Sequence, residues 1–167
     1  LSQAYPEPEP AALTADGWFR GHFEPWEGLW HAAPGGFSHM PGHGHQDCGG
    51  FELHFESVPV IVDPGRGGYA PVEEVSGMAQ NTLLVDGHDP YPPNKPYYDA
   101  AFRRRMAGPS PMLAGDGEGV ALTHSGFARL GSVGTVTRRW TFSGSRLTLA
   151  DHVEGDSRRS LARRLHT

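Results

Sequence analysis

The chain has 167 residues and a formal net charge of −5, and it contains 23 glycines, 15 prolines and 10 histidines. Glycine and proline interrupt helices, so this composition argues against a helical bundle and favours short strands joined by turns. No stretch approaches the roughly 18 apolar residues that a membrane span needs. The single cysteine, Cys48, excludes an internal disulfide and a multi-cysteine zinc site, which leaves histidine and carboxylate as the metal ligands to look for.

The first residues differ in character from the rest of the chain. Alternating prolines near the start predict an extended arm over residues 1–14, and one domain is expected over residues 15–167. The aromatic-rich stretch 16–30 predicts short strands whose large side chains cover a core, with a sugar-stacking platform as the functional alternative.

Alternation of apolar and polar residues predicts most of the remaining strands. In residues 50–56, Phe51, Leu53 and Phe55 share one face, and a short apolar run follows over residues 58–62 at hairpin distance. Further strands are predicted at residues 82–85, 120–123, 134–142, 146–153 and 160–166, whereas residues 98–106 could form one or two helical turns. Short strands with glycine-rich turns are typical of an antiparallel β-sandwich, so the expected fold class is all-β.

The densest chemical signal precedes the strand at residues 50–56. In an extended backbone His43 and His45 project to the same side. There the two imidazoles can bind the same metal, or one can bind the metal while the other contacts substrate. Asp47 takes the next position on that side. Asp63 ends the partner strand of the hairpin, but simple pairing about Ser57 would leave it several residues from His45, so their proximity requires a bulge or a bend.

Three ordered motifs make the chain resemble the heparinase II/III-like polysaccharide lyases. The first is Gly-His-Gly-His-Gln-Asp, followed by a Phe-Glu-Leu strand, over residues 42–53. The second is Val-Asp-Pro-Gly at residues 62–65, and the third is Gln-Asn-Thr-Leu-Leu-Val-Asp-Gly at residues 80–87. The strands at residues 137–142 and 147–153 are also similar to later strands of that family.

This resemblance implies a C-terminal β-sandwich that packs against an N-terminal (α/α) toroid. It implies cleavage of uronic-acid-containing glycans by β-elimination, an anionic polysaccharide as substrate, and a periplasmic or extracellular location. By motif position His43 corresponds to the sandwich histidine that reaches the active site, while His45 and Asp63 correspond to two ligands of a structural zinc.

Two departures from the family pattern affect these expectations. Gln80 stands where the family has its third zinc ligand, a histidine, and an amide oxygen is a poor ligand for zinc. In addition, the family's acid and base lie on the toroid, which these residues do not include. We therefore expect a piece of a longer chain, inactive without a toroid from the same chain or from a partner, with truncation near Thr167 because the last strand lacks a closing turn.

Two other functions remain open at this stage. Gln80 favours a non-catalytic sandwich that binds glycan or supports another domain, and the paired histidines before a strand also resemble a cupin-like metal enzyme. Arg103, Arg104 and Arg105 are candidates for binding an anionic glycan through bidentate pairs. Six later arginines, Arg138 among them, fit outward strand faces better than a nucleic-acid groove, because the overall charge is negative.

Overall fold

The structure is a computed structural model that describes residues 13, 15–32, 46–65, 79–92, 108–155 and 158–167. Within these ranges the chain forms ten strands, and every strand pairing is antiparallel. The expected all-β sandwich is confirmed. In the described part of the chain, no helix has both the length and the apolar character that crossing a membrane requires.

The first sheet follows chain order. It contains β1 (Trp18–Phe23), β2 (Trp26–His31), β3 (Phe51–Phe55) and β4 (Val58–Ile61). Along β3, buried Phe51 and Leu53 alternate with partly exposed Glu52 and His54, as the sequence predicted. This alternation gives the sheet one face toward the core and one face toward solvent.

The β3–β4 hairpin closes through a two-residue turn. Glu56 and Ser57 both have positive φ angles, 49° and 65°, and a pair of positive φ angles matches the natural twist of a tight hairpin. The pairing predicted from the sequence holds for Leu53 with Ile61, but a bulge after Leu53 shifts the register by one residue nearer the turn.

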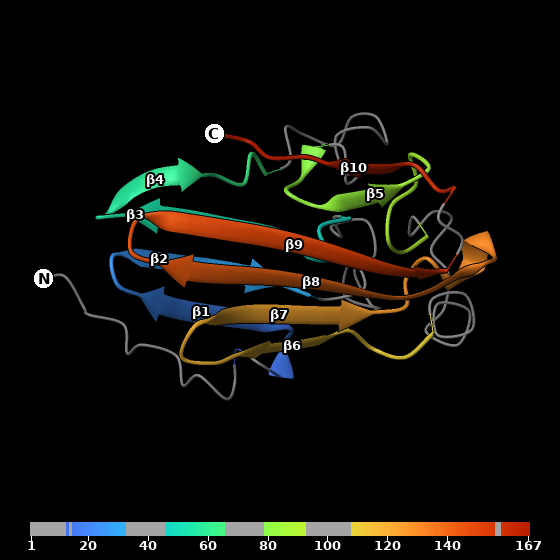
Figure 1. Cartoon of the computed structure of the whole chain (residues 1–167), viewed down its shortest axis with the longest axis horizontal. Helices are drawn as coiled ribbons and strands as arrows, with labels where there is room; N and C mark the ends of the chain where they lie inside the picture. The colour runs from blue at the N-terminus through green and yellow to red at the C-terminus, as the bar shows by residue number, and fades with distance from the viewer. Residues whose placement is uncertain (1–12, 14, 33–45, 66–78, 93–107, 156–157) are drawn as a thin grey trace, which may run out of the picture.

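The second sheet lies against the first (Figure 1). It contains β6 (Met112–Gly115), β7 (Gly119–His124), β8 (Val133–Ser143) and β9 (Arg146–Gly155), again in chain order, with the short 3₁₀ helix Ala128–Leu130 between β7 and β8. A separate two-stranded sheet pairs β5 (Leu83–Val85) with β10 (Leu161–Arg163). This small sheet ties the last residues of the chain to the segment that follows Gln80.

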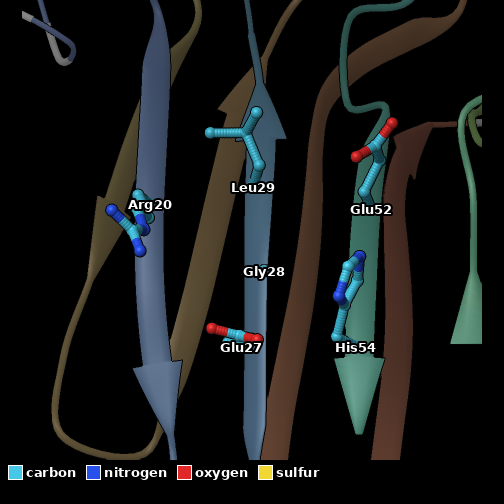
Figure 2. A pocket seen from close by; sticks show the side chains of 6 residues that line it. All are labelled: Arg20, Glu27, Gly28, Leu29, Glu52 and His54. Carbon is cyan, nitrogen blue, oxygen red and sulfur yellow. The ribbon is translucent and has the colours of Figure 1, made fainter. Parts of the chain in front are cut away.

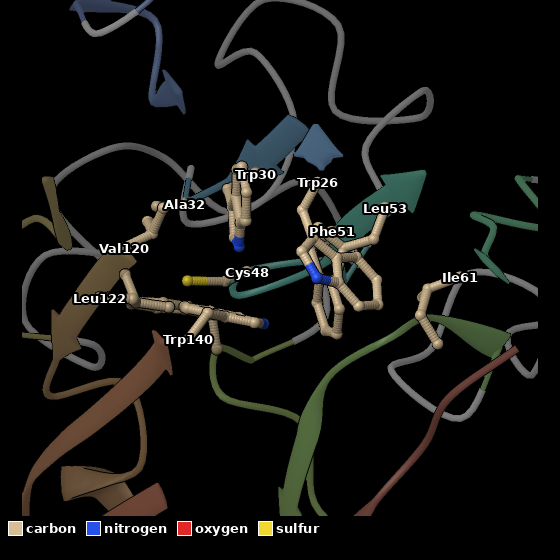
Figure 3. Packing of buried hydrophobic residues seen from close by; sticks show 11 residues of the cluster. Trp26, Trp30, Ala32, Cys48, Phe51, Leu53, Ile61, Val120, Leu122 and Trp140 are labelled. Carbon is tan, nitrogen blue, oxygen red and sulfur yellow. The ribbon is translucent and has the colours of Figure 1, made fainter. Parts of the chain in front are cut away.

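The main core lies between the two large sheets. Aromatic residues of the first sheet meet Trp140 of β8: the ring centroid of Trp30 lies 6.1 Å from that of Trp140, and the centroid of Phe51 lies 5.2 Å from it, both edge to face (Figure 3). Each such pair contributes about 0.5–1.5 kcal/mol beyond its buried area. At the hairpin end, Trp26 Nε1 also donates across the sheets to the carbonyl of Gly144 at 2.8 Å.

Candidate functional site

Asp63 follows β4 and is held in a tight turn. Its backbone N–H donates to Glu52 Oε1 at 3.4 Å, and its Oδ1 accepts a hydrogen bond of 2.7 Å from the N–H of Gly65. A carboxylate that bonds the amide two residues further on forms an Asx turn. The turn therefore fixes Asp63 beside β3, at the edge of the first sheet.

Gln80 lies directly against Asp63. With its amino group facing the carboxylate, Gln80 donates to Oδ1 at 3.0 Å and to Oδ2 at 3.1 Å. Gln80 is fully buried, and a buried amide needs hydrogen-bond partners. Asp63 and Gln80 belong to two different motifs of the chain. The two motifs thus meet through one side-chain contact, which occupies both carboxylate oxygens.

Asn81 holds this segment against the end of the first sheet. Its Nδ2 donates to the carbonyls of Phe51 at 2.9 Å and Val62 at 2.8 Å, and its Oδ1 accepts from the N–H of His166 at 2.7 Å. All these partners are backbone groups, and Asn81 has no exposed surface. Asn81 is therefore a structural tie between β3, the end of β4 and the last residues of the chain.

Arg138 reaches the same region from the opposite sheet. Its Nη1 donates to the carbonyl of Gly49 at 3.0 Å and to the carbonyl of Asn81 at 3.1 Å, and the residue is only 2% exposed. Gly49 follows the histidine motif, and Asn81 follows Gln80. One guanidinium group therefore fixes the backbone next to both segments that carry candidate site residues.

The expected outward orientation of Arg138 is wrong. The side chain is accommodated inside because Asp151, directly opposite on β9, places Oδ1 2.9 Å from its Nε. The side chain of Asp151 is itself only 3% exposed, and its Oδ2 also pairs with Nε of Arg163 at 2.6 Å. The Arg138 guanidinium carbon also lies 5.9 Å from the ring centroid of Phe51, within the range of a cation–π contact.

Three buried titratable groups near the core are neutral at physiological pH. Burial raises the pKa of the Cys48 thiol, and the charge of Asp47 raises it further. Burial likewise raises the pKa of Tyr91, while burial and then the Arg138 charge lower the pKa of His124 to about 4. Cys48 is also only 4% exposed, so it is a small buried thiol and not a reactive one.

The structure also shows a contact that the sequence did not suggest. His31 Nδ1 lies 3.0 Å from Asp47 Oδ1, with both side chains largely buried. The ring of His31 stacks at an angle against Trp18, with ring centroids 4.2 Å apart. No spacing rule joins these residues, because Trp18 and His31 meet only through the β1–β2 pairing and Asp47 comes from the segment before β3.

Several predicted features fall outside the described residues. They are the arm over residues 1–14 apart from Leu13, the helical turns over residues 98–106, and the side chains of His43, His45, Arg103, Arg104 and Arg105. Of the site residues predicted from the sequence, the described ranges place Asp63 and bring Gln80 to it. Those same ranges contain no group of three or more histidine, cysteine, aspartate or glutamate side chains that could hold a metal ion.

Comparison with known proteins agrees with the order of motifs and with the fold. A search of curated protein sequences gives no match. The family described as Heparinase II/III-like, C-terminal, matches residues 6–167, which is nearly the whole chain. The chain therefore belongs to the heparinase II/III-like C-terminal domain family, a polysaccharide-lyase-related family of β-sandwich domains.

Proposed function

We propose that this chain is the β-sandwich portion of a polysaccharide lyase that cleaves uronic-acid-containing glycans by β-elimination. The observation that carries the proposal is the family match over residues 6–167. The meeting of Asp63 with Gln80 supports it, because two of the three ordered motifs come together in space. The cupin alternative loses its basis, since the same residues belong to a different family.

The chemistry of β-elimination sets what such a sandwich has to contribute. A base removes the proton at C5, an acid protonates the leaving oxygen at C4, and a nearby group neutralises the uronate carboxylate so that the C5 proton becomes more acidic. Within the described ranges, Tyr91 and His124 are 2% and 5% exposed and lie in the core. They cannot contact a polysaccharide. On the family resemblance we assign the acid and base to an (α/α) toroid, with His43 reaching the same active site from the sandwich.

The described residues at the expected metal site do not fit a zinc ion well. Asp63 accepts hydrogen bonds from Gln80 at both oxygens and from the Gly65 amide at one of them. Zinc prefers histidine nitrogen, thiolate or free carboxylate oxygen, and the Gln80 amino group is a donor and not a ligand. We propose that the Gln80–Asp63 pair holds the two segments together where relatives use the metal, so that zinc binding through His45 and Asp63 is weak.

A non-catalytic sandwich that binds or supports glycan is the second candidate, and Gln80 is the observation that favours it. The two candidates differ at His43, because only the lyase requires this imidazole. For the lyase we further propose an anionic polysaccharide substrate contacted by Arg103, Arg104 and Arg105, and a periplasmic or extracellular location.

The test uses the sandwich joined to an (α/α) toroid of the same family, with the unsaturated uronate product followed by ultraviolet absorbance. His43→Ala should lower turnover by about 100-fold or more, the usual cost of removing one group that stabilises the charge developed in the transition state. His22→Ala is the matched control, because His22 lies on β1 with a side chain that is 67% exposed. Equal loss in both variants, or no loss in either, would contradict the assignment of His43.

A further inference from the structure

The solvent-facing side of the first sheet carries an organised set of polar and aromatic side chains. Strand pairing aligns Arg20 with Leu29 and Leu29 with Glu52 across β1, β2 and β3. The next row aligns Glu27 with His54. Figure 2 shows these side chains projecting from neighbouring strands on one face of the sheet. Leu29 therefore forms an apolar floor with hydrogen-bonding groups on both sides.

Two hollows lie next to each other on this face. One has a volume of about 250 Å³ and is lined by Arg20, Glu27, Gly28, Leu29, Glu52 and His54. The other has a volume of about 180 Å³ and includes Trp18, His31, Leu29, Glu52 and Asp63 in its lining. Because Leu29 and Glu52 line both hollows, the two form one continuous depression across the strands. A depression of two ring-sized hollows suits a ligand built from repeated rings.

Trp18 and His31 give one end of the depression a pre-formed surface. The Trp18 and His31 rings are 4.2 Å apart between centroids, and His31 Nδ1 is 3.0 Å from Asp47 Oδ1. The Asp47 carboxylate lies on the Nδ1 side of the imidazole, so Nε2 is the nitrogen not directed at Asp47. An indole beside an imidazole offers a flat apolar surface next to a hydrogen-bonding group.

The charges around the depression select against an anionic ligand. Among the described residues of the lining, Arg20 is the one permanently charged cation, whereas Glu27, Glu52 and Asp63 are carboxylates, and Asp47 lies 3.0 Å from His31. A uronate or sulfate group would face net negative charge here. Carboxylates accept hydrogen bonds from hydroxyl groups, and guanidinium donates to hydroxyl oxygens, so the chemistry fits a neutral, hydroxyl-rich ligand.

We propose that this depression binds neutral sugar residues of a glycan chain. Trp18 contacts the apolar face of a sugar ring, Glu52 and His31 bind its hydroxyl groups, and the larger hollow takes the neighbouring sugar. This site goes beyond the proposed lyase function, because it requires neither a toroid nor His43. Binding of a glycan at this site would not require a uronate residue.

Trp18 also provides the means to test the site. The chain has four tryptophans, and Trp26, Trp30 and Trp140 are 6%, 0% and 0% exposed, whereas Trp18 is partly exposed. Acrylamide, a neutral quencher, should therefore quench mainly Trp18 fluorescence. The probes are cellohexaose, mannohexaose and laminarihexaose as neutral chains, with an oligogalacturonate of matched length as the anionic comparison. At least one neutral probe should protect Trp18 from acrylamide, and the oligogalacturonate should not.

Variants separate the site from nonspecific protection. Glu52→Ala and His31→Ala should each weaken binding of the protecting sugar about tenfold, the effect of losing one or two hydrogen bonds. His152→Ala, at an exposed position on β9 of the other sheet, should leave binding unchanged. Isothermal titration calorimetry with Trp18→Phe checks that binding of the sugar depends on the Trp18 indole. The proposal is overturned if no neutral probe protects Trp18, if the oligogalacturonate protects it better, or if binding survives both Glu52→Ala and His31→Ala. None of these results depends on lyase turnover, so the lyase proposal is judged separately.

Discussion

Gln80 and Asp63 form a two-point contact, with the Gln80 amide nitrogen 3.0 Å from Oδ1 and 3.1 Å from Oδ2 of the carboxylate. The contact joins the segment after β4 to the segment before β5 through one neutral amide and one carboxylate. A histidine at position 80 would instead place a ring nitrogen near Asp63, where the two could share a metal. We therefore expect this one substitution to convert a hydrogen-bonded contact into a pair of side chains able to bind a metal.

Replacing Gln80 by histidine should create a zinc site. We expect the native chain to hold well under one zinc per chain after exposure to the metal, and Gln80→His to approach one, as measured by metal analysis after gel filtration. Adding His45→Ala to Gln80→His should remove the zinc again, because His45 is the proposed nitrogen ligand. Gln80→Leu is the control for simple loss of the amide, and it should gain no zinc. A full zinc complement in the native chain would show that Gln80 does not prevent binding.

The buried arginine should matter far more for stability than its exposed neighbour. Arg138→Met leaves the Asp151 carboxylate, which is 3% exposed, with one cation instead of two and releases the carbonyls of Gly49 and Asn81. We expect the free energy of unfolding to fall by about 3–5 kcal/mol. Arg163→Met removes the other cation from Asp151, but Arg163 is 46% exposed, so its loss should cost less than about 1 kcal/mol. Urea denaturation of both variants gives the comparison, and equal losses would contradict the central role of Arg138.

His124 should make the fold less stable in mild acid. Burial lowers the pKa of His124 from 6.5 to about 4 in the folded chain. The unfolded chain therefore takes up a proton first as the pH falls below 6.5, and stability is lost progressively until the folded form is also protonated near pH 4. The full difference corresponds to about 3 kcal/mol.

The contribution of His124 can be isolated by substitution. His124→Gln should flatten the decline of melting temperature between pH 6.5 and pH 4 relative to the native chain, whereas His22→Gln on the exposed β1 surface should not. The same decline in His124→Gln as in the native chain would mean that His124 does not titrate as described. The Nδ1 atom of His124 accepts from the N–H of Gly126 at 3.1 Å, and a glutamine oxygen can retain an acceptor there.

Gly28 in β2 should tolerate no side chain. A Cβ atom at this position would lie 2.5 Å from Leu53 Cδ2 and 2.7 Å from the carbonyl oxygen of Glu52. We expect Gly28→Ala to destabilise the fold by about 1–3 kcal/mol through overpacking. Gly117→Ala is the control, because nothing lies within 4 Å of its added Cβ. Equal denaturation midpoints for the two variants would contradict the close packing at β2.

Much of the fold could be predicted from alternation along the chain. The β3–β4 and β8–β9 hairpins follow the predicted segments because apolar and polar residues alternate over several positions. The strand β6 was missed, since Met112–Gly115 is short, mostly exposed and bordered by proline and glycine residues. Only its pairing with β7 makes it a strand.

The site was harder to predict because it depends on partners in other strands. Arg138 stands between Val136 and Trp140 on the buried face of β8, whereas the sequence analysis placed it on an outward face because its side chain is charged. Asp151 resolves this conflict, and its position opposite Arg138 is a property of the β8–β9 register. The family resemblance assigned Asp63 and the position of Gln80 to one zinc site, but it did not indicate their direct hydrogen bond, and the Asp47–His31 contact had no signal in the sequence.

The most direct test of the central claim compares the 167 residues alone with the same residues joined to an (α/α) toroid. Both are incubated with heparin, heparan sulfate and alginate, and the ultraviolet absorbance of unsaturated uronate is recorded. We predict no product from the 167 residues alone and steady product formation from the joined protein on at least one of these glycans. Turnover by the 167 residues alone, or none from a folded joined protein, would contradict the claim that this sandwich completes its active site with a toroid.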